Sequence, residues 1–168
     1  MNVKLIAITK SVIEEKELSA EELITYIARV SNPSNQLNMD TSVKLLKYLV
    51  NNKHWSPFEQ ASMTVEIITS RTIAHQILRH RSFVFQEFSQ RYSKALEFES
   101  IQLRKQADKN RQSSTELIDE KENEFLQNQI ESIFTQSKQL YEYMLHSGVA
   151  KECARFVLPE VMQTTLYM

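Results

Sequence analysis

A chain of 168 residues with 42% hydrophobic and 24% charged residues has an ordinary globular composition, and we expect residues 1–168 to form a single domain. The net charge of -1 excludes general electrostatic capture of nucleic acid or of a membrane surface. The single cysteine, Cys153, excludes an intramolecular disulfide and a multi-cysteine zinc site, which is typical of a reducing compartment.

Two absences narrow the possible classes further. The N-terminus "MNVKLIAITK" has no signal-peptide cleavage pattern, and no apolar run approaches the ~20 residues that span a bilayer, so we expect a cytoplasmic, soluble protein. Gly148 is the only glycine, which excludes both a G-x-G-x-x-G turn of a Rossmann domain and a glycine-rich phosphate loop. Side chains and helix N-termini must therefore bind any nucleotide phosphate.

The first half of the chain alternates strand and helix signals. Residues 3–9 are apolar and β-branched, which predicts a strand. Ser19 and Glu22 form a capping box before an amphipathic helix, and a second helix is predicted over residues 41–52. Ser56 and Glu59 flank Pro57 as a second capping signature. The apolar residues expected to face inward on the two helices are Leu23, Ile24, Ile27, Val30, Val43, Leu45, Leu46, Leu49 and Val50.

The second half contains one strand and three helices by the same criteria. Residues 61–69 alternate in polarity as a half-buried strand does, and Ser70 can cap a helix over 71–81. Residues 104–124 contain no aromatic residue, so we expect a flexible connection there. A long amphipathic helix then ends near Gly148, and a last helix is predicted over 149–157. These elements predict an α+β fold, with a small, mostly antiparallel sheet flanked by long helices.

Residues 71–92 concentrate side chains suited to binding an anion. Arg71, His75 and Arg79 recur every fourth residue and therefore share one face of the predicted helix. A solvated charged face is the ordinary explanation, and a bound phosphate, which guanidinium groups contact in pairs, is the functional one. Polar side chains then alternate with three aromatic residues that either pack in the core or stack on a planar ring. These aromatic residues are Phe83, Phe85 and Phe88.

The spacing within this segment resembles a family signature. Arg79, His80 and Arg81, then seven residues, then Ser89 fit the R-H-R-x7-S motif of flavin-dependent thymidylate synthases, the ThyX family. Three flanking blocks are also similar to that family and follow in its order. They are "ARVS" at residues 28–31, "HWSPFEQ" at 54–60 and "ECARFVLP" at 152–159.

The resemblance implies a reaction and its partners. Members of this family are methyltransferases of dTMP biosynthesis that convert dUMP to dTMP, with methylenetetrahydrofolate as the carbon donor and FAD as a hydride carrier reduced by NADPH. They are homotetramers without a Rossmann domain, which agrees with the single glycine. The resemblance implies no metal, and we expect no nucleic-acid or membrane partner.

The family's site residues carry over position by position. The resemblance implies FAD binding by Ser31, His54, Ser56, Glu59, Arg79, His80, Arg81 and Glu87. It implies dUMP binding by Gln76, Leu78, Arg79, Glu87, Phe88, Ser89, Gln90, Arg91 and Arg155. Ser89, His54 and Arg155 are the implied catalytic residues. Arg91 and Arg155 are the better phosphate ligands because each offers a permanently charged fork.

Two of these assignments, and the role of Cys153, have open alternatives. Ser89 lacks an evident adjacent base, so we expect it to orient and polarise the uracil and not to attack it. His54 is expected near the flavin ring, with a capping or core histidine as the alternative. Cys153 is interpreted as a small core residue, although a nucleophilic cysteine would be the analogy from the unrelated classical thymidylate synthases.

The family pattern continues beyond what this chain contains. A T-x-N-x-R-S block, a further arginine and an A-Q-x-E-I-R segment are expected after the final "LPEVMQTTLYM" and are not in the sequence. We therefore interpret the chain as C-terminally truncated relative to the family, with little or no synthase activity expected from these residues alone. The alternative function is a truncated, non-catalytic relative that binds flavin or nucleotide.

A second alternative comes from a different class of protein. Arg71, Arg79, Arg81 and Arg91, together with the phenylalanines, could bind RNA by phosphate contacts and base stacking. The near-zero net charge and the lack of a recognisable RNA-binding motif argue against that function.

Overall fold

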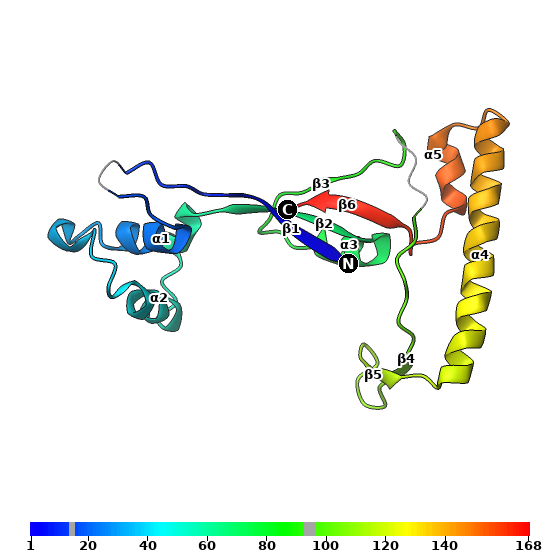
Figure 1. The fold of residues 1–168 in the computed structure, drawn as a ribbon, viewed down its shortest axis with the longest axis horizontal. Coiled ribbons are helices and arrows are strands. Elements are labelled where there is room, and N and C mark those ends of the chain that lie inside the picture. Colours follow the sequence, from blue (N-terminus) through cyan, green and yellow to red (C-terminus); the bar gives the residue numbers. More distant parts are fainter. Residues whose placement is uncertain (14–15, 93–96) are drawn as a thin grey trace. The chain divides into compact units, whose positions relative to one another are not determined.

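The structure is a computed structural model that describes residues 1–13, 16–92 and 97–168 (Figure 1). It confirms the α+β fold class, with a four-stranded sheet, a separate two-stranded sheet and several helices. The chain divides into two compact units, one of Val3–Glu66 and one of Met1–Asn2 with Ile67–Met168. The single domain expected from the sequence stays a prediction.

The Val3–Glu66 unit is mainly helical. Its elements are β1 (Asn2–Ile8), α1 (Ala20–Ala28), η1 (Pro33–Asn35), α2 (Ser42–Asn51), η2 (Ser56–Gln60) and the beginning of β2 (Met63–Ser70). The capping box before α1 is confirmed, because the Ser19 hydroxyl accepts from the Glu22 amide at 3.2 Å and the Glu22 carboxylate accepts from the Ser19 amide at 2.9 Å. The predicted strand and both helices of this half are therefore present.

Parts of the predicted inward face are wrong. Val30 is 69% exposed because α1 ends at Ala28, two residues before it, and Val43 and Val50 are exposed on α2. The buried residue at the end of α1 is instead Arg29, whose guanidinium donates to the Asn38 carbonyl and to the Thr41 hydroxyl. A charged group can be buried there because its donors are satisfied.

The second capping signature is also wrong. Ser56 begins the short 3-10 helix η2, and the N-cap is Trp55, which makes no side-chain capping bond. Pro57 lies in the first turn, where its missing amide hydrogen costs nothing. The sequence pattern therefore located a helix start but not its type.

The Ile67–Met168 unit contains the longest helix and most of the strands. Its elements are the end of β2, α3 (Arg71–Ile77), β3 (Gln86–Glu87), β4 (Arg104–Gln106), β5 (Ser114–Leu117), α4 (Glu120–His146), α5 (Lys151–Ala154), η3 (Arg155–Val157) and β6 (Gln163–Tyr167). After α4, Gly148 has a φ of 82°, the left-handed conformation that the sequence predicted for a helix end. Tyr141 is buried on α4, whereas Ile133 and Leu140 are exposed, so the apolar side chains of this predicted amphipathic helix are only partly inward.

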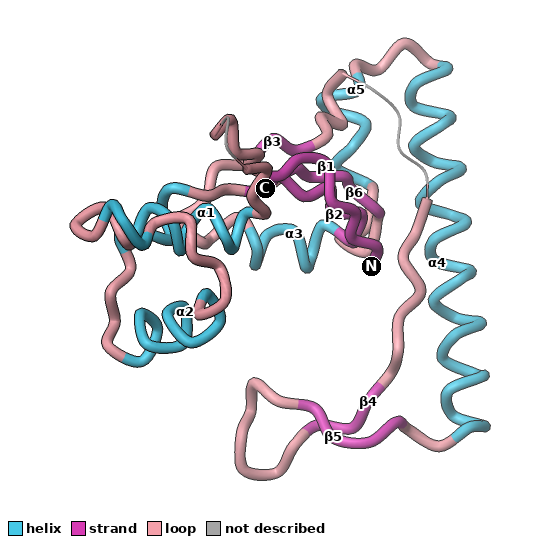
Figure 2. The backbone as a smooth tube through the Cα atoms, turned by 60° about the vertical axis from the view of Figure 1, so that its left-hand side comes forward, coloured by secondary structure: helices cyan, strands magenta, loops and turns pink. Residues whose placement is uncertain are grey.

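The C-terminal strand β6 organises the sheet, whose order is β1-β2-β6-β3. β6 pairs antiparallel with β3, with Gln86 opposite Tyr167 and Glu87 opposite Leu166. Figure 2 shows β6 beside β2 and β3. No element was predicted for residues 163–167, so the strand that pairs with β3 was missed.

Residues 104–124 hold more structure than the sequence indicated. β4 and β5 form an antiparallel hairpin, and α4 already begins at Glu120. The side chains of both strands are exposed. The hairpin was not predicted, and the flexibility of this connection stays a prediction. Among the helices of the described ranges, none has the length and apolarity to cross a membrane.

Candidate functional site

The cationic run of Arg79, His80 and Arg81 follows helix α3 and is not part of it. α3 ends at Ile77, and the Arg79 and His80 amides donate to the carbonyls three residues earlier, at 3.3 and 3.1 Å. These tight turns remove Arg79 from the predicted helical column, which is therefore wrong for that residue. Arg71 and His75 remain on one face of α3, with Arg71 NH2 3.4 Å from His75 Nε2.

The side chains of this run are available to an anion. Arg79, His80 and Arg81 are exposed, and no ion pair joins them to a carboxylate within residues 1–13, 16–92 and 97–168. Two guanidinium groups with free donors suit a diphosphate, so the residues fit the phosphate part of FAD. Nearby, Gln76 is exposed and Leu78 is half-buried.

An aromatic run continues from the cationic one. The His80 and Phe83 rings have centroids 6.1 Å apart, and those of Phe83 and Phe85 are 6.4 Å apart, both edge to face. Phe83 is exposed, which argues against core packing for it, whereas Phe85 and Phe88 are half-buried. Phe83 is thus the one member of this aromatic run with an exposed ring that a planar ligand could contact.

Strand β3 fixes the residues that follow. The Phe88 amide donates to the Thr165 carbonyl at 2.8 Å, which extends the β3–β6 ladder by one residue. Glu87 is half-buried, and its carboxylate accepts from the Thr164 hydroxyl at 2.9 Å and lies 3.7 Å from Arg71 NH1. Ser89, immediately after the ladder, is exposed. The ladder therefore presents Ser89 at the end of a short anchored strand.

A turn at residues 89–92 carries the next predicted ligands. The Tyr92 amide donates to the Ser89 carbonyl at 3.1 Å, and the Tyr92 carbonyl accepts from Lys151 Nζ at 2.8 Å, which ties the turn to α5. Gln90 is only 5% exposed, and its Nε2 has no hydrogen-bond partner in the described part of the chain. A buried amide donor is costly to leave unpaired, and Gln90 Nε2 is such a donor. No side-chain hydrogen bond joins Ser89 to a base among the described residues.

Glu152 brings the two predicted phosphate ligands together. Arg91 NH2 lies 3.4 Å from Glu152 Oε2, and Arg155 Nε donates to the Glu152 carbonyl at 3.2 Å. The Arg155 guanidinium also lies over the Phe156 ring, 5.7 Å from its centroid. Arg91 and Arg155 are separated by sixty-four positions in sequence, yet both contact Glu152.

The remaining predicted flavin ligands lie in the Val3–Glu66 unit. Ser31, His54, Ser56 and Glu59 are all exposed there. The His54 ring meets the Tyr48 ring edge to face, with centroids 5.9 Å apart, and its exposure argues against a core histidine. Ser31 lines a cavity of about 510 Å³, and Arg29, Lys44 and Tyr48 line it as well. Arg79, His80, Arg81 and Glu87, the other predicted flavin ligands, belong to the second unit.

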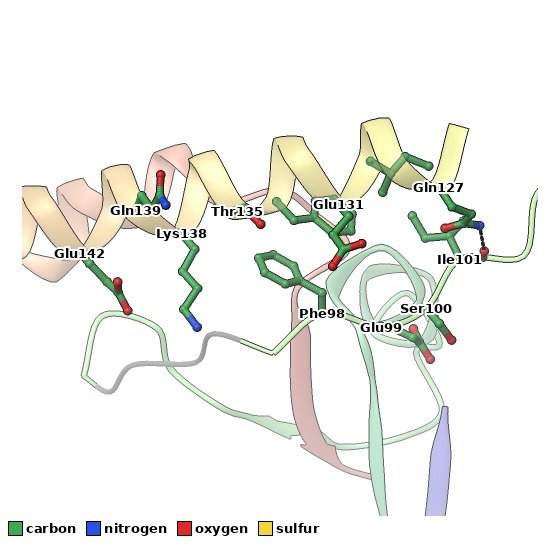
Figure 3. A pocket seen from close by; sticks show the side chains of 12 residues that line it. Phe98, Glu99, Ser100, Ile101, Gln127, Glu131, Thr135, Lys138, Gln139 and Glu142 are labelled. Carbon is green, nitrogen blue, oxygen red and sulfur yellow. Dashed lines mark hydrogen bonds between the residues drawn. The ribbon is translucent and has the colours of Figure 1, made fainter. Parts of the chain in front are cut away.

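A further cavity lies apart from the predicted residues. It has a volume of about 730 Å³ and is formed by residues 98–101 and one face of α4 (Figure 3). The Phe98 and Phe134 rings stack there with centroids 4.6 Å apart, and Gln127 Nε2 donates to the Ile101 carbonyl at 2.8 Å. None of the predicted site residues lines it. Among the described residues, no group of His, Cys, Asp or Glu side chains is placed to hold a metal ion.

Residues 12–168 match the family model for "Thymidylate synthase complementing protein". A probable flavin-dependent thymidylate synthase of Paramecium bursaria Chlorella virus 1 is 52% identical over 169 residues, which covers 100% of this chain and 78% of that protein. The chain belongs to the flavin-dependent thymidylate synthase family. A flavin-dependent thymidylate synthase of Synechocystis is 49% identical over 170 residues, again covering 100% of this chain and 78% of the relative.

The fold of this chain is similar to that of a solved structure. The UMP/dUMP methylase PolB from Streptomyces cacaoi, bound with 5-Br UMP, superposes with a TM-score of 0.81 at 25% identity. The match covers 99% of this chain and 69% of that chain. The same enzyme bound with 5-Br dUMP gives a TM-score of 0.80 at 23% identity, covering 99% of this chain and 70% of that one.

Sequence reasoning missed several residues that contact the predicted site. Glu152 stands inside the quoted 152–159 block but was given no role, although a carboxylate three residues before Arg155 is a recognisable signal. Thr164 and Glu160 gave no signal, because their roles depend on the long-range pairing of β6. Lys151 is likewise visible only once α5 is placed beside the 89–92 turn.

Proposed function

We propose that this chain catalyses the reductive methylation of dUMP to dTMP, with FAD as cofactor and with methylenetetrahydrofolate and NADPH as co-substrates. This replaces the expectation of little or no activity, because relatives at 52% and 49% identity are named as a probable flavin-dependent thymidylate synthase and as a flavin-dependent thymidylate synthase. The observation that carries the proposal is the convergence of Arg91 and Arg155 on Glu152, beside the turn that begins at Ser89. Family membership and the likeness to a nucleotide methylase support the same reaction.

The nucleotide is bound through its phosphate and its base. Arg91 and Arg155 bind the phosphate of dUMP, because each can donate two parallel hydrogen bonds to it. Glu87, Ser89 and Gln90 come from the anchored β3 strand and its turn, and they bind and orient the pyrimidine ring and the sugar. The Ser89 hydroxyl polarises the uracil, and Gln76, Leu78 and Phe88 complete the surroundings.

The flavin supplies hydride transfer when bound, and the chain supplies its orientation and electrostatic environment. Arg79, His80 and Arg81 hold its phosphates in place of a glycine-rich loop, which suits a chain with one glycine. Ser31, Ser56 and Glu59 add polar contacts, and His54 positions folate or water near the flavin ring. The absence of carboxylate partners for the cationic run among the described residues supports this assignment.

The active protein is a homotetramer in this proposal. All seven residues of β1 are exposed, and its apolar side chains include Val3, Leu5 and Ile8. An exposed apolar strand at a sheet edge favours pairing with another chain. Light scattering of the purified protein tests this directly, with a mass four times that of one chain as the expected result.

The reaction is tested by incubating purified protein with FAD, NADPH, methylenetetrahydrofolate and radiolabelled dUMP. We expect dTMP to form and to require each component, with omission of any one component as the control. Bound flavin and bound dUMP without dTMP would instead identify the non-catalytic binding relative. If the protein binds no nucleotide but binds RNA with an affinity that falls steeply with salt, the RNA-binding alternative is favoured.

A further inference from the structure

We propose that Arg71 and Thr164 are positioning residues that hold the Glu87 carboxylate in one orientation, with its second oxygen left free to accept a hydrogen bond from the ligand. This inference rests on the proposed role of Glu87 in binding nucleotide or flavin. Neither Arg71 nor Thr164 belongs to the residues implied by the family motifs, and both are placed by pairing that the sequence does not reveal.

The β3–β6 register explains why the Glu87 side chain meets Thr164. Glu87 pairs with Leu166, so its side chain lies on the same face of the sheet as Leu166 and as Thr164, two residues earlier on β6. That face is buried, since Thr164 is 3% exposed and Leu166 is 0% exposed. A carboxylate directed to a buried face is costly unless it is paired or hydrogen-bonded. Its partners therefore decide its orientation.

Both partners act on the same carboxylate oxygen. The Thr164 hydroxyl donates to Glu87 Oε1 at 2.9 Å, and Arg71 NH1 lies 3.7 Å from that oxygen. Among the described residues, no hydrogen bond or ion pair reaches Glu87 Oε2. A carboxylate oxygen accepts hydrogen bonds, so Oε2 is suited to an N–H or O–H group on the ligand, such as a ring imide or a sugar hydroxyl.

The Arg71 cation is itself held in place. Its amide, at the first position of α3, donates to the Met162 carbonyl at 2.9 Å, and the next amide, of Thr72, donates to the Glu160 carbonyl at 3.1 Å. Glu160 Oε2 lies 4.0 Å from Arg71 Nε and 3.4 Å from His75 Nδ1. A basic side chain at a helix N-terminus opposes the helix dipole, so its carboxylate partners and not helix formation account for its position.

The experiment measures dUMP affinity of flavin-loaded protein by calorimetry in the wild type and in Thr164→Val, Thr164→Ser and Thr165→Val. Thr164→Val removes the donor at nearly constant volume, and we expect affinity to fall about tenfold, the size expected for a hydrogen bond to a charged group. Thr164→Ser restores a hydroxyl and should bind within about twofold of wild type. Thr165→Val is the matched control, because the structure gives the Thr165 side chain no bond to Glu87, and it should leave affinity unchanged.

A double-mutant cycle separates positioning from general damage. In a Glu87→Gln background, Thr164→Val should cause no further loss of affinity, because the oriented carboxylate is already gone. Arg71→Met is a second route to the same result and should also be silent in that background. Additive losses in both cycles, or equal losses for Thr164→Val and Thr164→Ser, would overturn the inference.

The outcome also distinguishes this inference from the proposed function. Wild-type protein that binds no dUMP would contradict the function itself. Wild-type protein that binds dUMP normally, with Thr164→Val and Arg71→Met unchanged, would contradict only the positioning role. Should Thr164→Val fold poorly by thermal melting, the Arg71→Met cycle decides alone, since Arg71 makes its contacts at the surface end of the network.

Discussion

Arg91 in the turn after β3 and Glu152 on α5 form an ion pair, with 3.4 Å between Arg91 NH2 and Glu152 Oε2. Both side chains are more than half exposed, so the pair contributes at most about 1 kcal/mol. A weak pair of this kind holds the arginine near Arg155, which contacts the Glu152 carbonyl, without locking it. In the proposed function, the phosphate of dUMP replaces this carboxylate as the partner of Arg91.

The cationic run after α3 should control flavin retention. Replacing Arg81 by Met removes a charged donor, and we expect the apparent dissociation constant for FAD to rise about 10-fold or more. Arg111→Met is a matched control, because Arg111 is an exposed arginine in the connection between β4 and β5. The measurement is a titration of deflavinated protein followed by flavin fluorescence. Equal affinities in the two variants would refute the assigned role of Arg81.

The lowered pKa of Glu99 predicts how the stability of the folded protein depends on pH. Partial burial raises the pKa of Glu99, but hydrogen bonds from the Met1 ammonium and from Ser70 outweigh it and lower the pKa from 4.5 to about 2. A lowered folded-state pKa stabilises the protein above about pH 4.5, and this stability is lost as the pH falls toward 2. We expect the ionised Glu99 to stabilise the folded protein by about 2–3 kcal/mol, a value reduced because its partner, the Met1 ammonium, is partly exposed to solvent.

Denaturant unfolding at pH 6 and at pH 3 checks the Glu99 prediction. Glu99→Gln should be less stable than wild type at pH 6, with the difference shrinking at pH 3 because Glu99 is then protonated in the unfolded wild-type chain, which lowers the free energy of that state. Glu97→Gln, an exposed carboxylate two residues away, serves as the control and should change little at either pH. A pH-independent difference for Glu99→Gln would show that the ionised carboxylate is not the source of the stability.

The stacked rings of Phe98 and Phe134 join α4 to the segment before β4. Their centroids lie 4.6 Å apart at an interplanar angle of 13°, and we expect Phe134→Ala to reduce the free energy of unfolding by about 2–3 kcal/mol. Phe125, on the same helix, is 62% exposed, so Phe125→Ala should cost less than about 0.5 kcal/mol. Urea denaturation of the three proteins is the measurement. A similar cost for both variants would contradict a packing role specific to Phe134.

The features of the fold that the sequence predicted correctly are those that depend on local signals. The capping box at Ser19 and the glycine cap at Gly148 depend on a few neighbouring residues, and both are present. The column that included Arg79 was wrong because periodicity continues past α3, while the backbone tightens into turns after Ile77. Helix ends are set by backbone geometry that a repeating pattern does not record.

Long-range pairing was the part that sequence could not predict. β6 lies inside the sheet, and its register with β3 brings Thr164 to Glu87 across 77 positions of sequence. A five-residue strand near the end of a chain carries little periodic signal, so neither the strand nor its partner was assigned. The motif residues themselves were located by their resemblance to a family, and their roles stay predictions.

The central claim is that arginine side chains, in a chain with one glycine, bind the phosphate of a pyrimidine nucleotide. The most direct measurement compares the affinity of flavin-loaded protein for dUMP and for deoxyuridine, in wild type and in Arg91→Met. We predict that wild type prefers dUMP by about 100-fold or more and that Arg91→Met loses about tenfold of that preference while binding deoxyuridine normally. Equal affinity of wild type for the two compounds, or an unchanged preference in Arg91→Met, would contradict the claim.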